Sequence, residues 1–142
     1  MKKLISVLIS VCILAGCFGI TACADETNVY TANSVGARNL YTMSVSTSLS
    51  KTNSKISYYC MVAAKSNATE VNIYLYLQEY RDGKWVDVSA VSKTASTRTV
   101  YATNTYDKHV KGRKYRTDAH VYVYSGNKCE YIHSNSSVVT NT

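Results

Sequence analysis

From Leu40 onward, apolar and polar residues alternate along the chain with a period of two, and no long stretch keeps the spacing of a helical stripe. This pattern predicts extended strands separated by short polar turns. The expected strands cover residues 40–48, 55–64, 71–80, 85–92, 97–105, 115–124 and 130–138. Seven strands of this length and spacing predict an all-β protein built as an antiparallel β-sandwich.

The alternation also predicts which residues form the core. Side chains two positions apart on a strand share one face, so each strand can present one apolar face. The expected core residues are Ile56, Tyr58, Cys60 and Val62 in the second strand, Val71, Ile73, Leu75 and Leu77 in the third, and Thr117, Ala119, Val121 and Val123 in the sixth.

The dipeptide Asp82-Gly83 predicts a two-residue hairpin turn, because both residues accept the positive φ angles that such a turn requires. The resulting register pairs Tyr80 with Trp85, Gln78 with Asp87 and Tyr76 with Ser89, and it sets Leu77 against Val88 and Leu75 against Ala90. One strand cannot present both kinds of side chain to the same side. We therefore expect the aliphatic set (Leu75, Leu77, Val88, Ala90) to point inward and the aromatic set (Tyr74, Tyr76, Tyr80, Trp85) to point outward.

Tyr115 opens the sixth strand after a turn at Gly112. This arrangement resembles the tyrosine corner of immunoglobulin and fibronectin type III sandwiches, in which the hydroxyl bonds to the backbone a few residues upstream. An ordinary core tyrosine at the start of a strand is the alternative. With a tyrosine corner, the predicted fold is a seven-stranded immunoglobulin-like antiparallel β-sandwich.

The N-terminus predicts export. Lys2 and Lys3 precede an uncharged apolar run over residues 4–20, and Ala22-Cys23-Ala24 has the small-x-small pattern of a signal-peptidase site. We expect a helical signal peptide at 1–24, a flexible leader at 25–39 and the β-sandwich domain at 40–142, so that the mature protein is secreted. Loss of the two N-terminal lysines lowers the formal net charge from +7 to +5.

A second processing signal overlaps the first. Leu14-Ala15-Gly16-Cys17 resembles a bacterial lipobox, in which the cysteine is acylated and becomes the new N-terminus. That cut would hold the protein at a membrane and leave Cys23 over, whereas cleavage after Ala24 leaves Cys60 and Cys129 as an even pair. Cysteine parity therefore favours ordinary secretion, and a lipoprotein acylated at Cys17 is the alternative.

Cys60 and Cys129 are candidates for a disulfide, because an exported protein meets an oxidising environment. A bridge closing a loop of about 70 residues would stabilise the fold by roughly 4 kcal/mol. In an immunoglobulin-like strand order, however, the second and last strands lie in different sheets, which can leave the two Cα atoms too far apart. Two reduced thiols are the alternative.

No residue pattern predicts catalysis, a metal site or a cofactor. His109, His120 and His133 lack the spacings that build zinc sites. The nine acidic residues are scattered singly, so no paired-carboxylate site is visible. Asp118 and His120 share a strand face, but no nucleophile elbow or oxyanion-hole motif accompanies them. We expect a protein that is not an enzyme and uses neither metal nor cofactor.

Five basic residues cluster around the turn before the sixth strand: Lys108, Lys111, Arg113, Lys114 and Arg116. Outside a cell, such a basic patch could hold an anionic polymer or a phospholipid surface. No nucleic-acid partner is expected, because no RNA-binding motif is present. The alternative is a solvated turn that keeps the domain soluble.

The best candidate binding surface is aromatic. In an immunoglobulin-like order the third and sixth strands are neighbours. That neighbourhood would gather Tyr74, Tyr76, Tyr80, Trp85, Tyr122 and Tyr124 on one outer surface, which we call the aromatic face. Such a surface suits sugar rings or a protein partner, including a second copy of this chain. The alternative is that the aromatic pairs only stabilise an exposed sheet.

Three segments of the chain resemble a known group of proteins. They are Thr21-Ala22-Cys23-Ala24-Asp25-Glu26, the hairpin over 77–85 and the segment over 112–124. These segments resemble small secreted β-sandwich proteins of Gram-positive gut anaerobes, a family of unknown function. The resemblance implies an immunoglobulin-like fold but no site, so no functional residue follows from it.

Overall fold

The computed structural model describes residues 39–142, so the expected signal peptide and all of the expected leader except Asn39 lie outside the described residues. The strands are β1 (Thr42–Lys51), β2 (Ile56–Ala64), β3 (Glu70–Arg81), β4 (Lys84–Ala95), β5 (Thr99–Tyr106), β6 (Lys114–Ser125), β7 (Lys128–Asn135) and β8 (Val139–Thr140). The seven predicted strands are confirmed with ends shifted by a few residues, and β8 is an addition. No helix among the described residues is long and apolar enough to span a bilayer.

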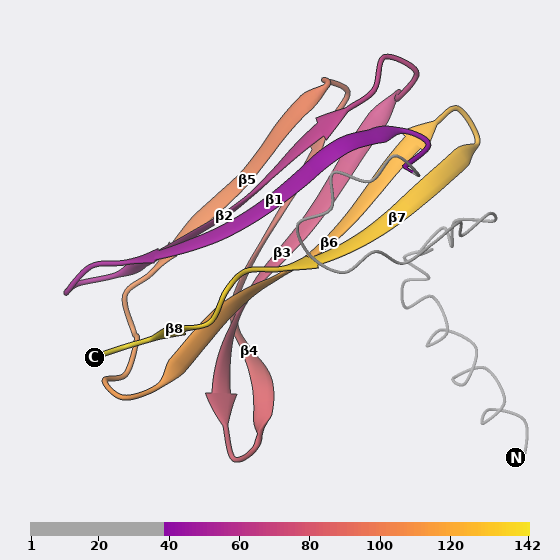
Figure 1. Ribbon diagram of the computed structural model, residues 1–142. Helices are drawn as coiled ribbons and strands as arrows, with labels where there is room; N and C mark the ends of the chain where they lie inside the picture. The colour runs from indigo at the N-terminus through magenta and orange to yellow at the C-terminus, as the bar shows by residue number, and fades with distance from the viewer. Residues whose placement is uncertain (1–38) are drawn as a thin grey trace, which may run out of the picture.

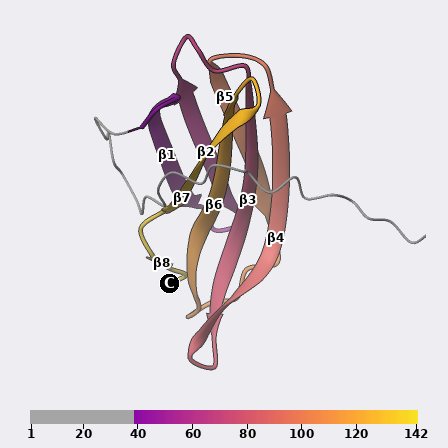
Figure 2. The same ribbon diagram turned by 90° about the vertical axis from the view of Figure 1, so that its right-hand side faces the viewer.

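The strands form two antiparallel sheets that pack face to face (Figures 1 and 2). One sheet has the order β1-β2-β5, and the other has the order β4-β3-β6-β7, with β8 paired to the start of β6. The predicted β-sandwich is therefore confirmed, and so is the expected pairing of β3 with β6. The β3–β4 hairpin extends beyond the rest of the sandwich at the lower end of both views.

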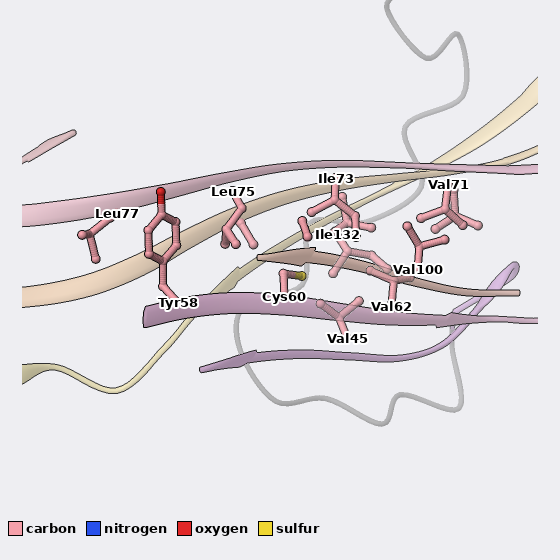
Figure 3. Packing of buried hydrophobic residues seen from close by; sticks show 14 of the residues in the cluster. Val45, Tyr58, Cys60, Val62, Val71, Ile73, Leu75, Leu77, Val100 and Ile132 are labelled. Atoms are coloured by element: carbon pink, nitrogen blue, oxygen red, sulfur yellow. The ribbon is translucent and has the colours of Figure 1, made fainter. Parts of the chain in front are cut away.

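The core lies between the two sheets and follows the alternation of the sequence. All twelve residues expected there on β2, β3 and β6 are at most 1% exposed. The remaining strands add Val45, Val100, Ala102 and Ile132, so both sheets contribute to one continuous cluster. Figure 3 shows several of these side chains interleaved between the sheets.

The β3–β4 pairing departs from the predicted register at a β-bulge. Tyr80 pairs with Trp85 and Gln78 with Asp87 as expected, but the register then shifts, and Leu77 pairs with Ser89. Val88 is the extra residue, and its apolar side chain packs against the core. Beyond the bulge each remaining partner is one residue later than expected.

Three further expectations for β4 are therefore wrong. Tyr76 pairs with Ala90 and Leu75 with Val91, because the extra residue advances β4 by one position. Ala90 is exposed rather than turned inward, and Val91 packs against the core in its place. A one-residue shift exchanges the two faces of a strand.

The hydrogen bond expected of a tyrosine corner is present at Tyr115. Its hydroxyl accepts from the backbone N–H of Val110 at 2.8 Å, five residues upstream. The same hydroxyl donates to Glu79 Oε2 at 2.7 Å. Tyr115 therefore fastens the loop that enters β6 onto β3.

The expected bond between Cys60 and Cys129 is not formed, because Cys60 carries a free thiol. Cys60 lies in the middle of β2 opposite Ala102, whereas Cys129 lies at the hairpin end of β7, in the other sheet, opposite Tyr124. Figure 3 shows Cys60 packed as a core residue, and burial raises the pKa of its thiol to about 12. Cys129 is disulfide-bonded.

Glu130 is a buried acid that ties the start of β1 to β7. Its carboxylate accepts the backbone N–H groups of Leu40 and Tyr41 at 2.8 and 3.1 Å and the Thr42 hydroxyl at 2.7 Å. Three donors compensate the cost of burying this side chain, which is 1% exposed. The domain therefore begins with a contact that joins its two sheets.

Candidate functional site

The outer surface of the β4-β3-β6-β7 sheet carries the residues of the aromatic face. Because β3, β6 and β7 are paired in register, their outward side chains form rows across the sheet. Tyr74 pairs with His120, which pairs with His133 in turn. Tyr76 pairs with Asp118, and Tyr122 pairs with Tyr131. All of these positions lie opposite the buried face, on strands that the core holds in place.

The rings of neighbouring rows touch one another. Tyr74 meets Tyr122 edge to face, with ring centroids 6.0 Å apart, and Tyr122 lies 5.0 Å from Tyr131. Tyr76 meets His120 edge to face at 5.9 Å, and His120 stacks on His133 at 4.8 Å. These contacts bring rings from three strands into one surface.

A second group of rings lies toward the β3–β4 turn. Tyr80 and Trp85, which pair across that hairpin, have ring centroids 5.1 Å apart. The guanidinium of Arg116 lies over the indole of Trp85, 4.4 Å from its centroid. Arg116 Nε also donates to Gln78 Oε1 at 2.9 Å. Arg116 therefore covers one side of Trp85, in a cation–π contact.

Exposure differs among the six predicted aromatic residues. Tyr74 and Tyr80 are 42% and 40% exposed, whereas Tyr76, Trp85, Tyr122 and Tyr124 are partly buried. Tyr124 lies at the far end of β6, opposite Cys129, away from the Trp85 group. The two most open rings of the aromatic face are therefore those of Tyr74 and Tyr80.

Between the two groups of rings lies a polar cluster of Asp118, His120 and His133. His133 Nε2 is in direct contact with Asp118 Oδ1, and His120 Nε2 lies 3.6 Å from Asp118 Oδ2. Gln78 Nε2 donates to Asp118 Oδ2 at 3.2 Å. Asn135, with its amide oriented to satisfy both polar atoms, donates to Asp118 Oδ1 at 2.9 Å.

The charge of Asp118 is stabilised by these neighbours. Burial raises the pKa of this carboxyl, but the adjacent imidazoles of His120 and His133 outweigh burial and leave the pKa below its ordinary value. His120 Nδ1 is 2.5 Å from the Tyr131 hydroxyl, which fixes the plane of the imidazole. The cluster therefore combines an ionised oxygen ligand with two imidazole nitrogens.

The basic patch is not held together as one surface. Lys108, Lys111, Arg113 and Lys114 are exposed around the loop before β6, but Arg113 Nε lies 3.8 Å from Glu79. Arg116 belongs to the outer sheet face, where it contacts Gln78 and Trp85. Lys108 and Lys111 therefore lie exposed on the loop, and Lys114 is exposed at the start of β6.

Sequence reasoning missed Tyr131 and His133 as members of this surface. A signal was present, because Gly126-Asn127 is a two-residue turn of the kind that joins paired strands. Gly126 has a φ of 62°, and Ser125 pairs with Lys128. Extending that register along the hairpin sets Tyr131 opposite Tyr122 and His133 opposite His120.

The chain matches no known protein-family model, and no curated protein or solved structure is detectably similar to it.

Proposed function

We propose that this protein is an exported, non-catalytic binding module that recognises a glycan through the outer face of the β4-β3-β6-β7 sheet. The observation that carries the proposal is the contacting set of rings on three paired strands, with Tyr74 at its most open point. Aromatic rings offer a large contact area with little conformational entropy to lose. Such rings can stack against the apolar faces of sugars.

Polar groups beside the rings support a glycan as the ligand. Asp118, Gln78 and Arg116 lie between the two groups of rings and already form hydrogen bonds with fixed directions. A binding site of apolar contact area with a few oriented polar groups is suited to a ligand that carries both kinds of surface. A sugar presents C–H groups on its faces and hydroxyl groups around its edge.

The geometry changes which ring should matter most. Arg116 covers one side of Trp85, so we assign stacking to Tyr74 and treat Trp85 as a nearby fluorescent reporter. Replacing Tyr74 with alanine should weaken glycan binding by about tenfold or more, the loss expected at an interface hot spot. The matched control is Tyr101→Ala, since Tyr101 is 58% exposed on β5 in the other sheet.

A glycan array followed by titration of each hit, read by Trp85 fluorescence, tests this proposal. Binding that Tyr74→Ala weakens and Tyr101→Ala leaves unchanged supports it. No binding to any glycan, or equal losses in both variants, overturns it. If sedimentation instead shows a concentration-dependent mass that Tyr76→Ser with Trp85→Ser removes, the surface serves association with a second copy.

The cysteines also bear on where the protein acts. Parity favoured cleavage after Ala24 only if Cys60 and Cys129 paired, but Cys60 is free and Cys129 is bonded. The other cysteines of the chain, Cys12, Cys17 and Cys23, all precede that cut. Cleavage after Ala24 would remove all three of these cysteines, whereas processing at Cys17 would keep Cys23.

We infer that the protein is instead a lipoprotein acylated at Cys17. That cut keeps Cys23, and acylation occupies the Cys17 sulfur, which leaves Cys23 as the one N-terminal thiol able to pair with Cys129. Intact-mass analysis of the protein from its own cells tests this inference. An acylated N-terminal Cys17 with a Cys23–Cys129 peptide supports it, and a mature chain that begins at Asp25 overturns it.

A further inference from the structure

We propose that Asp118, His120 and His133 form a binding site for a divalent transition-metal ion, with Zn²⁺ as the best-fitting probe. The three ligand atoms lie within 4.8 Å of one another on the outer sheet face. Two imidazole nitrogens and one carboxylate oxygen are a ligand set that suits Zn²⁺ and related ions. This proposal does not depend on glycan binding, because the metal ion alone is its probe.

Strand pairing holds the ligands together without a loop. His120 and His133 are direct partners across β6 and β7, and Asp118 lies two residues before His120 on the same face of β6. All three Cα positions are therefore set by backbone hydrogen bonds that the buried side of the sheet stabilises. A site on rigid strands loses little entropy when it binds an ion.

One ligand pair already has the spacing that an ion requires, and a second pair would have to separate. Zn²⁺ bonds to nitrogen and oxygen at about 2.0–2.2 Å, which places two tetrahedral ligands about 3.4 Å apart. His120 Nε2 and Asp118 Oδ2 are 3.6 Å apart. His133 Nε2 contacts Asp118 Oδ1 directly, so the ion would enter between this pair and replace their hydrogen bond.

Groups around the ligands hold them in the orientation that binding requires. The Tyr131 hydroxyl, 2.5 Å from His120 Nδ1, can accept a hydrogen bond from the Nδ1–H group, which leaves the Nε2 lone pair directed at the cluster. Gln78 and Asn135 both donate to the Asp118 carboxylate. Hydrogen bonds of this kind to ligating imidazoles and carboxylates are a regular feature of metal sites.

The site is open on one side. The side chains of His120 and His133 are 34% and 27% exposed, and that of Asp118 is 13% exposed. An ion could therefore enter from solvent, and water or a ligand atom could complete its coordination. Three protein ligands with an open position make a site that can also bind a partner group.

Titration of Zn²⁺ into the mature protein by calorimetry tests the proposal. We expect one ion per chain, and at a hundredfold excess over Kd a rise in Tm of at least about 5 °C. Mg²⁺ and Ca²⁺, which prefer all-oxygen sites, should give no comparable binding at the same concentration. No saturable Zn²⁺ binding, or equal binding of Mg²⁺, overturns the proposal.

Variants assign the binding to these residues rather than to cysteine thiols. Asp118→Asn keeps the side-chain shape, and His133→Gln keeps a polar side chain. Each substitution should weaken Zn²⁺ binding at least tenfold, because even residues that only support metal ligands cause losses of about that size. The matched control is His109→Gln, because His109 lies in the loop between β5 and β6 and contacts Asn141. Tyr131→Phe should also weaken binding, because it removes the hydroxyl that orients His120.

The outcomes separate cleanly. Binding that persists in both Asp118→Asn and His133→Gln, or that His109→Gln lowers equally, overturns the assignment. Each variant is first checked for a cooperative thermal transition without metal, and the pair provides two independent routes if one substitution unfolds the domain. Loss in both site variants with retention in the control supports the site.

Discussion

Glu79 shows how a charged residue is accommodated at a core position of β3. It continues the inward row of Leu75 and Leu77 and is 1% exposed. Arg81 Nε donates to its carboxylate at 2.5 Å, and the Tyr115 hydroxyl donates at 2.7 Å. The hydrogen bond from Arg81 lowers the pKa of Glu79 more than burial raises it. Glu79 is therefore ionised and paired where the aliphatic core ends.

Removal of the Tyr115 hydroxyl should cost more than removal of the Tyr58 hydroxyl. Tyr115 donates to the ionised Glu79, whereas Tyr58 donates to the neutral Ser89 hydroxyl at 2.7 Å. Hydrogen bonds to charged groups contribute about 1.5–3 kcal/mol and neutral ones about 0.5–1.5 kcal/mol. Tyr115→Phe and Tyr58→Phe, compared by urea unfolding, should follow that order. Equal losses would show that the charge of Glu79 adds nothing to the bond.

Acid should weaken the fold in part through Glu79. Its folded-state pKa is below its ordinary value, so its contribution to the free energy of unfolding is present above the ordinary pKa and is lost as pH falls through the folded-state pKa. Urea unfolding of the wild type and Glu79→Gln at pH 7, 5 and 3 measures this. The wild type should have the larger free energy of unfolding at pH 7, and the difference between the two proteins should become smaller toward pH 3. A gap that stays constant with pH would refute the assignment.

At the scale of elements, the bulge in β4 decides which residues face the core. Val88 is inserted between the pairs Gln78–Asp87 and Leu77–Ser89, and Val91 then faces inward while Ala90 faces outward. The bulge therefore gives β4 two segments of opposite alternation. Its first segment presents Trp85 outward, and its second presents Val91 to the core.

Paired lysine substitutions test this register. Ala90→Lys should change the free energy of unfolding by no more than about 0.5 kcal/mol, as at other exposed sites. Val91→Lys should lower it by about 1–3 kcal/mol, because it removes a packed side chain and brings an ammonium group toward the core. Thermal melts of both variants measure the difference. A larger loss of stability in Ala90→Lys than in Val91→Lys would contradict the bulge and support the regular register predicted from the Asp82-Gly83 turn.

The limits of sequence reasoning also lie at this scale. Period-two alternation predicted the inward rows of β2, β3 and β6, because burial on one side imposes that period. It could not predict the bulge, since no turn residue marks Val88 and the gain comes from packing across the sandwich. The aromatic residues of β3 and β6 followed from alternation and strand order, but the cover that Arg116 places on Trp85 depends on a side-chain conformation.

The polar cluster was missed for a different reason. A metal motif in one chain segment has a fixed spacing, but His120 and His133 meet only through the pairing of β6 with β7 across the Gly126-Asn127 turn. Cysteine parity likewise carries no information on position. Contacts made by strand pairing become visible only when the register is known.

At the scale of the whole molecule, both ends of the described chain are fastened to the sandwich. Glu130 on β7 accepts from Leu40 and Thr42 at the start, and Asn141 near the end exchanges backbone hydrogen bonds with Gly112 and Arg113. The two sheets share one core, so the domain should unfold as a single cooperative unit. Cys60 lies within that core and is 0% exposed.

Because Cys60 is buried, the rate at which it is alkylated reports how often the sandwich opens. Only a thiolate is alkylated readily, and this thiol is both enclosed and raised in pKa to about 12. Iodoacetamide should therefore modify Cys60 no faster than the sheets separate, and the rate should rise with urea in parallel with global unfolding. Peptide mass spectrometry follows the modification, with Cys60→Ala as the blank. Rapid labelling without urea would mean that the sandwich opens locally at β2. The labelling of this one sulfur atom therefore distinguishes local opening of a strand from global unfolding.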